Sequence, residues 1–197
     1  TMVRAQNFKQ EPSKYVGNIR RKDFYADYNK KIRELKIKSV LELGCASGDF
    51  LYQLPDEIDA TGLDISEDLI NIAKSTRQKS NINYVCADFF SYKPRQPFEL
   101  VVMTGFLCTF MEFEKVIDKA LTLSNHHIFI NDFFNKYGVN AHFSFKLDTE
   151  DYFQTPYTVW SQKTISNYLT KKGIKHQFTE YSVKENLMES LHPLHNF

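Results

Sequence analysis

Short apolar segments alternate with amphipathic segments through the middle of the chain, and this alternation constrains the fold most strongly. We interpret the apolar segments as strands in strict alternation with helices, and the segments with helical periodicity are 49–54, 66–79 and 113–123. Because each parallel strand connection needs a crossover, we predict an α/β fold: a Rossmann-like, doubly wound, mostly parallel sheet with helices on both faces. The expected strands are 38–44, 59–65, 81–88, 98–105 and 126–134.

The 197 residues suffice for one domain with a single core, so we predict one domain over residues 1–197. An amphipathic helix is expected at 18–36, a helix capped by Ser161 at 161–172, and a strand at 174–183. The predicted parts are an N-terminal arm and lid helix (1–36), a cofactor-binding core (37–132), a substrate-side insertion (133–160), and a C-terminal helix and strand (161–197).

Composition narrows the functional classes. A formal net charge of +1 gives no electrostatic case for nucleic acid as the main partner. The sequence has no apolar run long enough for a membrane span and no signal-peptide pattern, so we expect a cytoplasmic protein without a membrane partner. Cys45, Cys86 and Cys108 lie in apolar stretches without CxxC or Cys/His spacing, so we expect buried thiols and no metal site. The oligomeric state is not indicated.

The segment VLELGCASGDF, residues 40–50, joins the first expected strand to a helix. Gly44 and Gly48 allow a tight turn and close approach of the backbone to a ligand, and the following helix offers free N–H groups to an anion. Asp64 ends the next strand about 20 residues beyond the loop, where an acid can accept hydrogen bonds from both ribose hydroxyls. Asp88 and Phe89, after the third strand, offer an acceptor and an aromatic face to an adenine ring.

The motifs VLELGCASG, GLDIS, CADFF and FELVVMTG resemble, in this order and spacing, those of class I S-adenosylmethionine (SAM)-dependent methyltransferases. The resemblance covers roughly residues 38–132. The family's first motif runs acid-x-Gly-x-Gly-x-Gly; Glu42, Gly44 and Gly48 match it, while Ala46 replaces the middle glycine. A nicotinamide-binding domain would require G-x-G-x-x-G, which this loop lacks.

The resemblance implies SAM as cofactor and S-adenosylhomocysteine (SAH) as product, bound along the carboxyl ends of the strands. The N-terminal arm, with Lys14, Tyr15, Arg20 and Tyr25, is a candidate lid, and Tyr15 can face the sulfonium through a cation–π contact. A surface helix with solvated basic residues explains the arginines of this segment equally well. The implied cofactor-binding residues are Glu42, Gly44, Cys45 and Gly48 near the methionine part, Asp64 at the ribose, Ile65, Asp88 and Phe89 around the adenine, and Thr104 and Gly105 beside the methionine end. Tyr15 and Arg20 join the expected cofactor contacts as residues of the candidate lid.

Methyl transfer from a sulfonium is an in-line displacement, so positioning and exclusion of water do most of the work. A base is needed only if the acceptor must lose a proton. Asp132 ends the fifth expected strand and His142 follows in the insertion, so these two are the catalytic candidates. Each also has a purely structural explanation, because Asn131-Asp132 can form a turn and a single histidine among aromatic residues often only packs.

The composition of the insertion at 133–160 indicates the substrate class. Its aromatic residues offer stacking surfaces and its acidic residues offer hydrogen-bond acceptors, which suits a sugar ring, although such residues also pack loops onto sheets. Together with the following helix, the insertion is similar to uncharacterised methyltransferases encoded with bacterial surface-polysaccharide genes. The residues are Tyr137, Phe143, Phe145, Tyr152, Phe153, Tyr157 and Trp160, with Asp148, Glu150 and Asp151.

We therefore expect a methyltransferase that acts on oxygen or nitrogen of a small molecule, such as a carbohydrate or sugar-nucleotide intermediate. The alternatives are a non-catalytic SAM-binding module and an RNA or protein methyltransferase. Amino-group methylation of nucleic-acid bases is disfavoured, because TGFL stands where an Asn/Asp-Pro-Pro-aromatic tetrapeptide would follow the fourth strand.

Overall fold

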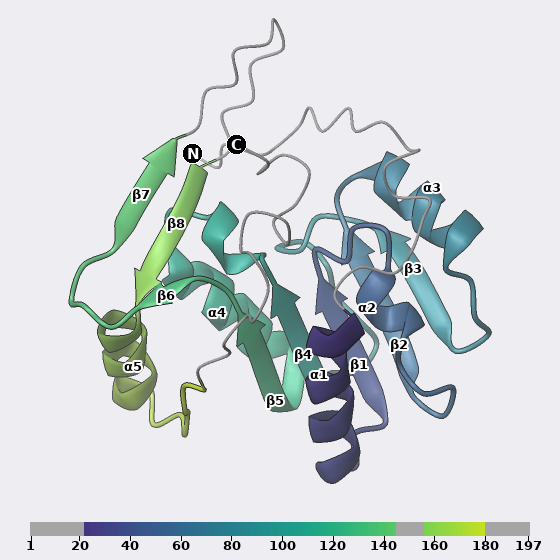
Figure 1. The fold of residues 1–197 in the computed structure, drawn as a ribbon, viewed down its shortest axis with the longest axis horizontal. Helices are drawn as coiled ribbons and strands as arrows, with labels where there is room; N and C mark the ends of the chain where they lie inside the picture. The colour runs from purple at the N-terminus through teal and green to yellow at the C-terminus, as the bar shows by residue number, and fades with distance from the viewer. Residues whose placement is uncertain (1–21, 145–155, 180–197) are drawn as a thin grey trace, which may run out of the picture.

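The computed structural model describes residues 22–144 and 156–179. Its main sheet has five parallel strands in the order β3-β2-β1-β4-β5 (Figure 1). Strand order reverses between β1 and β4, which is where open α/β sheets bind ligands at the carboxyl ends of their strands. The predicted parallel doubly wound fold is confirmed. The strands are β1 (Ser39–Leu43), β2 (Asp59–Asp64), β3 (Ile82–Cys86), β4 (Phe98–Thr104) and β5 (Ser124–Asn131).

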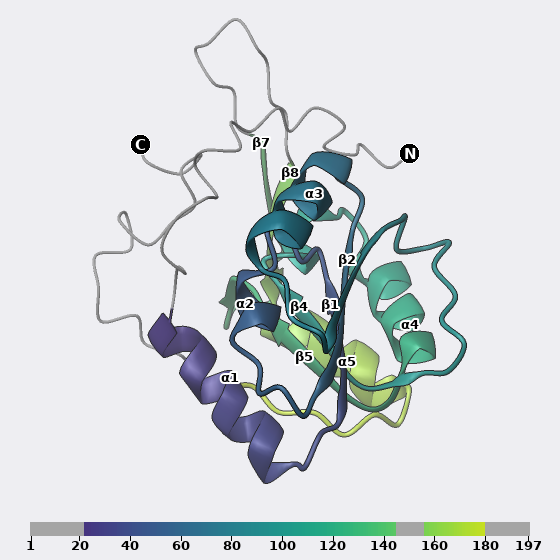
Figure 2. The same ribbon diagram turned by 90° about the vertical axis from the view of Figure 1, so that its right-hand side faces the viewer.

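Helices cover both faces of this sheet (Figure 2). One face packs against α1 (Lys22–Glu34), α2 (Asp49–Tyr52) and α3 (Glu67–Thr76). The opposite face packs against α4 (Phe113–Leu123) and α5 (Gln162–Lys171). No helix connects β3 to β4, so the strict alternation that the sequence suggested fails there; turns at 87–97 make the crossover instead.

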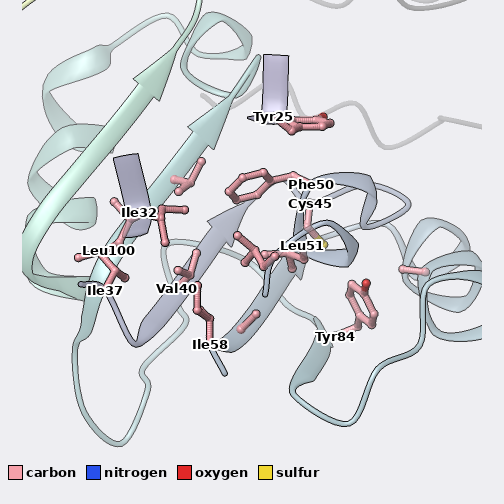
Figure 3. Close-up of a cluster of buried hydrophobic side chains, with 14 of the residues drawn as sticks. Tyr25, Ile32, Ile37, Val40, Cys45, Phe50, Leu51, Ile58, Tyr84 and Leu100 are labelled. Atoms are coloured by element: carbon pink, nitrogen blue, oxygen red, sulfur yellow. The ribbon is translucent and has the colours of Figure 1, made fainter. Parts of the chain in front are cut away.

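Alternation of side chains along the strands divides the core into two clusters. Val40 and Val102 face the cluster under α1, α2 and α3, whereas Leu41 and Met103 face the cluster under α4 and α5. Figure 3 shows the first cluster, in which Phe50 lies close to Tyr25 of α1. Their ring centroids are 5.4 Å apart, so Tyr25 belongs to the core rather than to a lid over a ligand.

The insertion contains a second, small sheet of three strands in the order β6-β8-β7: β6 (Phe134–Asn135), β7 (Ala141–Ser144) and β8 (Pro156–Ser161). Strand β8 packs against η2 (Leu107–Thr109), a short 3-10 helix that follows β4. The Trp160 indole N–H donates to the Leu107 carbonyl at 3.2 Å, and the Thr158 hydroxyl donates to the Phe110 carbonyl at 3.0 Å. Trp160 is only 2% exposed, so it is a core residue and not the stacking surface that we expected.

Two helix caps match the sequence patterns. The Ser66 hydroxyl accepts from the Leu69 N–H at the start of α3, and the Ser161 hydroxyl accepts from the Thr164 N–H at the start of α5. Gly173, just beyond α5, has a φ of 71°, the left-handed conformation typical of a helix end.

Other expectations are wrong or untested. The strand expected at 174–183 does not form over 174–179, which has no regular secondary structure, and 180–183 lie outside the described residues. Cys45 and Cys108 are buried as expected, but Cys86 is exposed. The single-domain organisation and its division into parts stay predictions. Among the described residues, no helix combines the length and apolar character needed to cross a membrane.

Candidate functional site

The loop between β1 and α2 has left-handed backbone conformations at alternate residues. Gly44, Ala46 and Gly48 have φ angles of 70°, 46° and 80°. The N–H groups of Gly44 and Cys45 both donate to the carbonyl of Leu63 in β2, at 2.8 and 3.1 Å. A Cβ on Gly48 would collide with the Tyr84 hydroxyl, so both backbone conformation and space require glycine there.

Ala46 is the residue that departs from the family motif, and it adopts the backbone conformation that the missing glycine would favour. A left-handed conformation costs an L-residue with a Cβ about 1–2 kcal/mol. The loop therefore keeps its shape without the middle glycine, at some cost in stability.

Replacing Ala46 with glycine is expected to raise the free energy of unfolding by about 1 kcal/mol, because relief of strain exceeds the added chain entropy. Lys36→Gly is the matched comparison, since exposed Lys36 is the other described non-glycine residue with positive φ, at 57°. Denaturant titration measures both changes. A loss of stability in Ala46→Gly alongside a gain in Lys36→Gly would show that the loop conformation is not strained.

Asp64 at the end of β2 is the predicted ribose acceptor, and it also organises the glycine loop. Its Oδ2 accepts from the Ala46 N–H at 3.0 Å and its Oδ1 from the Ser66 N–H at 2.9 Å. Burial raises the pKa of this carboxyl, while the backbone donors oppose the shift. Asp64 thus ties the loop after β1 to the start of α3, at the edge where a nucleoside would bind.

Glu42 in β1 is a buried carboxyl, only 4% exposed, and its Oε2 has no hydrogen-bond partner among the described residues. Burial raises its pKa well above the usual range, and the nearby charges of Asp49 and Asp64 add to that shift. A buried carboxylate without a partner is costly. A cation bound beside Glu42 would both supply the missing donors and favour the charged form.

The residues predicted around an adenine lie at the ends of β2 and β3. Ile65 follows Asp64 and is 46% exposed, which is unusual for an isoleucine at the edge of a core. Phe89 is buried, with its ring centroid 4.7 Å from that of Phe90 and 5.4 Å from that of Phe106. The Oδ1 of Asp88 accepts from the Phe90 N–H at 3.2 Å, so Asp88 also shapes this turn.

The end of β4 meets the glycine loop. The Thr104 hydroxyl is buried and has no partner among the described residues, while open space surrounds the Cα of Gly105 where a side chain would stand. Phe106 leans over Gly44: a Cβ on that glycine would lie 2.6 Å from the Phe106 ring. The sequence analysis missed Phe106, because an aromatic residue after a strand gives no signal of its own.

The two catalytic candidates lie in different surroundings. Asp132 follows β5, and its Oδ2 accepts from the Cys108 N–H at 3.0 Å, which fixes η2. Burial raises the pKa of Asp132. His142 in β7 instead shares a hydrogen bond with the Thr158 hydroxyl at 3.0 Å and packs edge-on against Trp160. It borders a cavity of about 500 Å³ whose other lining residues include Glu112, Lys115, Asn140 and Thr164.

Some predicted site residues cannot be placed. Tyr15, Arg20 and Lys14 lie outside the described residues, as do Phe145, Asp148, Glu150, Asp151, Tyr152 and Phe153 of the insertion. Of the other aromatic residues of the insertion, Tyr137 is 79% exposed and Phe143 47% exposed.

Residues 40–125 match the family model described as a methyltransferase domain. The matched segment holds the glycine loop, Glu42 and Asp64, and runs through β1 to β4 in the strand order given above. Residues 40–125 are therefore similar to a methyltransferase domain. No curated protein matches the chain by sequence.

Solved structures resemble this chain at low sequence identity. DesVI of Streptomyces venezuelae is 15% identical over 81% of this chain and 88% of its own, with a TM-score of 0.60. The sugar N-methyltransferase KedS8 from Streptoalloteichus sp. is 18% identical over 63% of this chain and 55% of its own, with a TM-score of 0.50. The plantazolicin methyltransferase BpumL, in complex with SAH, is 20% identical over 54% of this chain, with a TM-score of 0.47. The match spans only 44% of the BpumL chain.

Proposed function

We propose that the chain binds SAM and transfers its methyl group to nitrogen or oxygen of a small polar molecule. One observation carries this proposal: Glu42, a buried carboxyl with an unpartnered oxygen, stands directly before the glycine loop. The site thus offers an acid for a cation beside a loop suited to a nucleoside, and SAM carries an ammonium group, a sulfonium and an adenosine. A nicotinamide dinucleotide carries two phosphates, which the neighbouring carboxylates would repel.

The described residues fit this cofactor. Glu42 and the backbone of Gly44 would hold the methionine part, Asp64 would accept from the ribose hydroxyls, and Ile65 would cover the adenine. SAM supplies an electrophilic methyl group on a sulfonium. The roles of Tyr15 and Arg20 as lid residues, and of the remaining predicted cofactor contacts, are part of this proposal.

Proton removal from the acceptor is assigned to Asp132 in this proposal, with His142 as the second candidate. Asp132 is half-buried beside the carboxyl ends of β4 and β5, and its raised pKa makes it a stronger base than a solvated aspartate. The hydrogen bond between His142 and Thr158 favours a packing role for that histidine.

A carbohydrate is the proposed acceptor class. Exposed Tyr137 and Phe143 offer stacking faces in an insertion that is anchored to η2, which begins two residues after Gly105. KedS8, which shares the fold, is named a sugar N-methyltransferase. A link to bacterial surface-polysaccharide biosynthesis belongs to the same proposal.

Two measurements test the function. Calorimetry should show SAM and SAH each binding at a 1:1 ratio, and incubation with methyl-labelled SAM and a metabolite extract should label a small molecule. Cofactor binding without any labelling would indicate a non-catalytic binding module, and label in added RNA or protein would indicate a macromolecular acceptor. Absence of binding by either cofactor form would refute the proposal.

A further inference from the structure

The cavity that His142 borders lies between the small sheet and the start of α4, with a volume of about 500 Å³. Its lining residues come from 111–115, β7, β8 and the first turn of α5, and none stands at the carboxyl end of a main-sheet strand. Figure 1 shows β7 and β8 beyond β5, on the side away from β1 and β2. The cavity is therefore separate from the candidate cofactor site, and its volume lies within the range of about 300–1,000 Å³ that is usual for small-molecule sites.

Hydrogen bonds determine which ring nitrogen of His142 carries the proton. The Thr158 hydroxyl donates its single proton to the Phe110 carbonyl at 3.0 Å. The same oxygen lies 3.0 Å from His142 Nδ1, so it must accept there, and Nδ1 must be the protonated nitrogen. The other nitrogen, Nε2, has no hydrogen-bond partner among the described residues, and in a neutral imidazole it is an acceptor. The ring therefore offers the cavity a lone pair.

The amide of Asn140 is oriented by the same kind of argument. Its Oδ1 accepts from the Ser161 N–H at 2.9 Å. Only the oxygen of an amide can accept from an N–H group, so the assignment of oxygen and nitrogen is settled. The NH₂ group, with two donors, remains for a ligand. The cavity thus has an acceptor on His142 and donors on Asn140, both held in place by bonds to neighbouring groups.

The remaining lining residues give the cavity an apolar floor and a rim without excess positive charge. Phe113 and Trp160 are each 2% exposed, and their ring centroids lie 5.1 Å apart. The Lys115 ammonium pairs with the Glu112 carboxylate at 2.5 Å, and exposed Glu114 adds a negative charge. A phosphate or carboxylate ligand would be repelled rather than attracted.

We propose that this cavity binds a neutral carbohydrate, with His142 Nε2 accepting from one ring hydroxyl and the Asn140 amide donating to another. A sugar carries hydroxyls that both donate and accept, around a ring whose C–H face is apolar. These properties match the polar groups and the aromatic floor. The inference goes beyond the proposed function, because binding at this cavity requires neither SAM nor methyl transfer.

NMR titration of the ¹⁵N-labelled protein tests the inference. The probes are glucose, galactose, mannose and N-acetylglucosamine, each added separately up to about 50 mM, which detects millimolar affinity. At least one sugar is expected to shift the Asn140 side-chain amide and the His142 ring nitrogens, and the free protein should show the Nδ1–H tautomer of His142. An Nε2–H tautomer, or no shift at these two side chains with any of the four sugars, would overturn the inference.

Two variants separate this cavity from other surfaces. His142→Ala and Asn140→Asp should each weaken binding of the sugar about tenfold, because each loses one hydrogen bond to it. Thr158 keeps its bond to Phe110 in the first variant, and the new carboxylate in the second can still accept from the Ser161 N–H, so both should fold.

His126→Ala is the matched control, since His126 is an exposed histidine at the start of β5 and does not line the cavity. Its affinity for the sugar should stay within about twofold of that of the unmodified protein. Equal sugar affinity in His142→Ala, Asn140→Asp and His126→Ala would overturn the inference even if a sugar binds. Calorimetry with SAM is a separate measurement, so failure of the proposed function would be recognised independently.

Discussion

Asp64→Ala is expected to weaken SAM binding at least about 100-fold, the largest effect on affinity that the site predicts. Two ribose hydroxyls would each donate to this carboxylate, and hydrogen bonds to charged groups contribute about 1.5–3 kcal/mol apiece. Asp64 also accepts from the backbone N–H groups of Ala46 and Ser66. The variant therefore loses both the contacts to the ligand and the anchor of the glycine loop.

Asp64→Asn separates these two effects, because an amide oxygen can still accept from one backbone N–H while the negative charge is gone. Its affinity for SAM should fall between those of Asp64→Ala and the unmodified protein. Asp68→Ala, an exposed acid in the first turn of α3, is the control for a general loss of negative charge. Binding of SAM by Asp64→Ala within about threefold of the control would contradict the assigned ribose contact.

The part of the site that follows the strand ends was predictable from chain order. Parallel strands place their carboxyl ends at one edge, so Glu42, Gly44 and Asp64 meet there whatever the details of packing. Thr104 and Gly105, at the end of β4, were added by the resemblance to the methyltransferase family.

Residues that pack around the site from other elements were not predictable in the same way. Tyr28 belongs to the apolar stripe of α1, and only the rotation of that helix on the sheet turns its ring between Phe50 and Phe129. Trp160 was predicted to be a stacking surface for substrate, but it is buried. Its indole N–H donates to the Leu107 carbonyl in η2, 53 residues away in sequence. Long-range packing decides both cases, and a local pattern does not encode it.

The elements without periodicity were the other source of error. The crossover at 87–97 is filled by Phe89, Phe90 and Tyr92, which pack against the sheet without forming a helix. Residues 174–179 include Ile174, Phe178 and Thr179, residue types that are common in strands, but they have no strand partner within the described part of the chain. A strand depends on its neighbour, so composition alone overestimates it.

The ion pair between Arg77 and Asp49 holds the helix after the glycine loop. Arg77 Nε lies 2.9 Å from Asp49 Oδ1, and the two side chains are only 9% and 18% exposed. The guanidinium also lies 5.7 Å from the centre of the Tyr52 ring, and the Arg77 carbonyl accepts from the Tyr84 hydroxyl at 2.9 Å. The end of α3 is thereby joined to the first turn of α2.

Arg77→Ala is expected to lower the free energy of unfolding by about 3 kcal/mol, because it leaves Asp49 largely buried and unpaired near Glu42. For a domain of this size, the melting temperature should fall by roughly 6–12 °C. Adding Asp49→Asn to this variant should restore part of the loss, because the uncompensated charge disappears. Arg95→Ala, at an exposed position, should change stability by less than about 0.5 kcal/mol.

A full double-mutant cycle by denaturant titration measures the coupling between Arg77 and Asp49. The destabilisation comes mainly from the stranded carboxylate, so the coupling should exceed about 1 kcal/mol, well above the value for exposed pairs. Additive effects of the two substitutions would show instead that Arg77 acts through its packing on Tyr52. The glycine loop would then be held by Asp64 and by the Leu63 carbonyl.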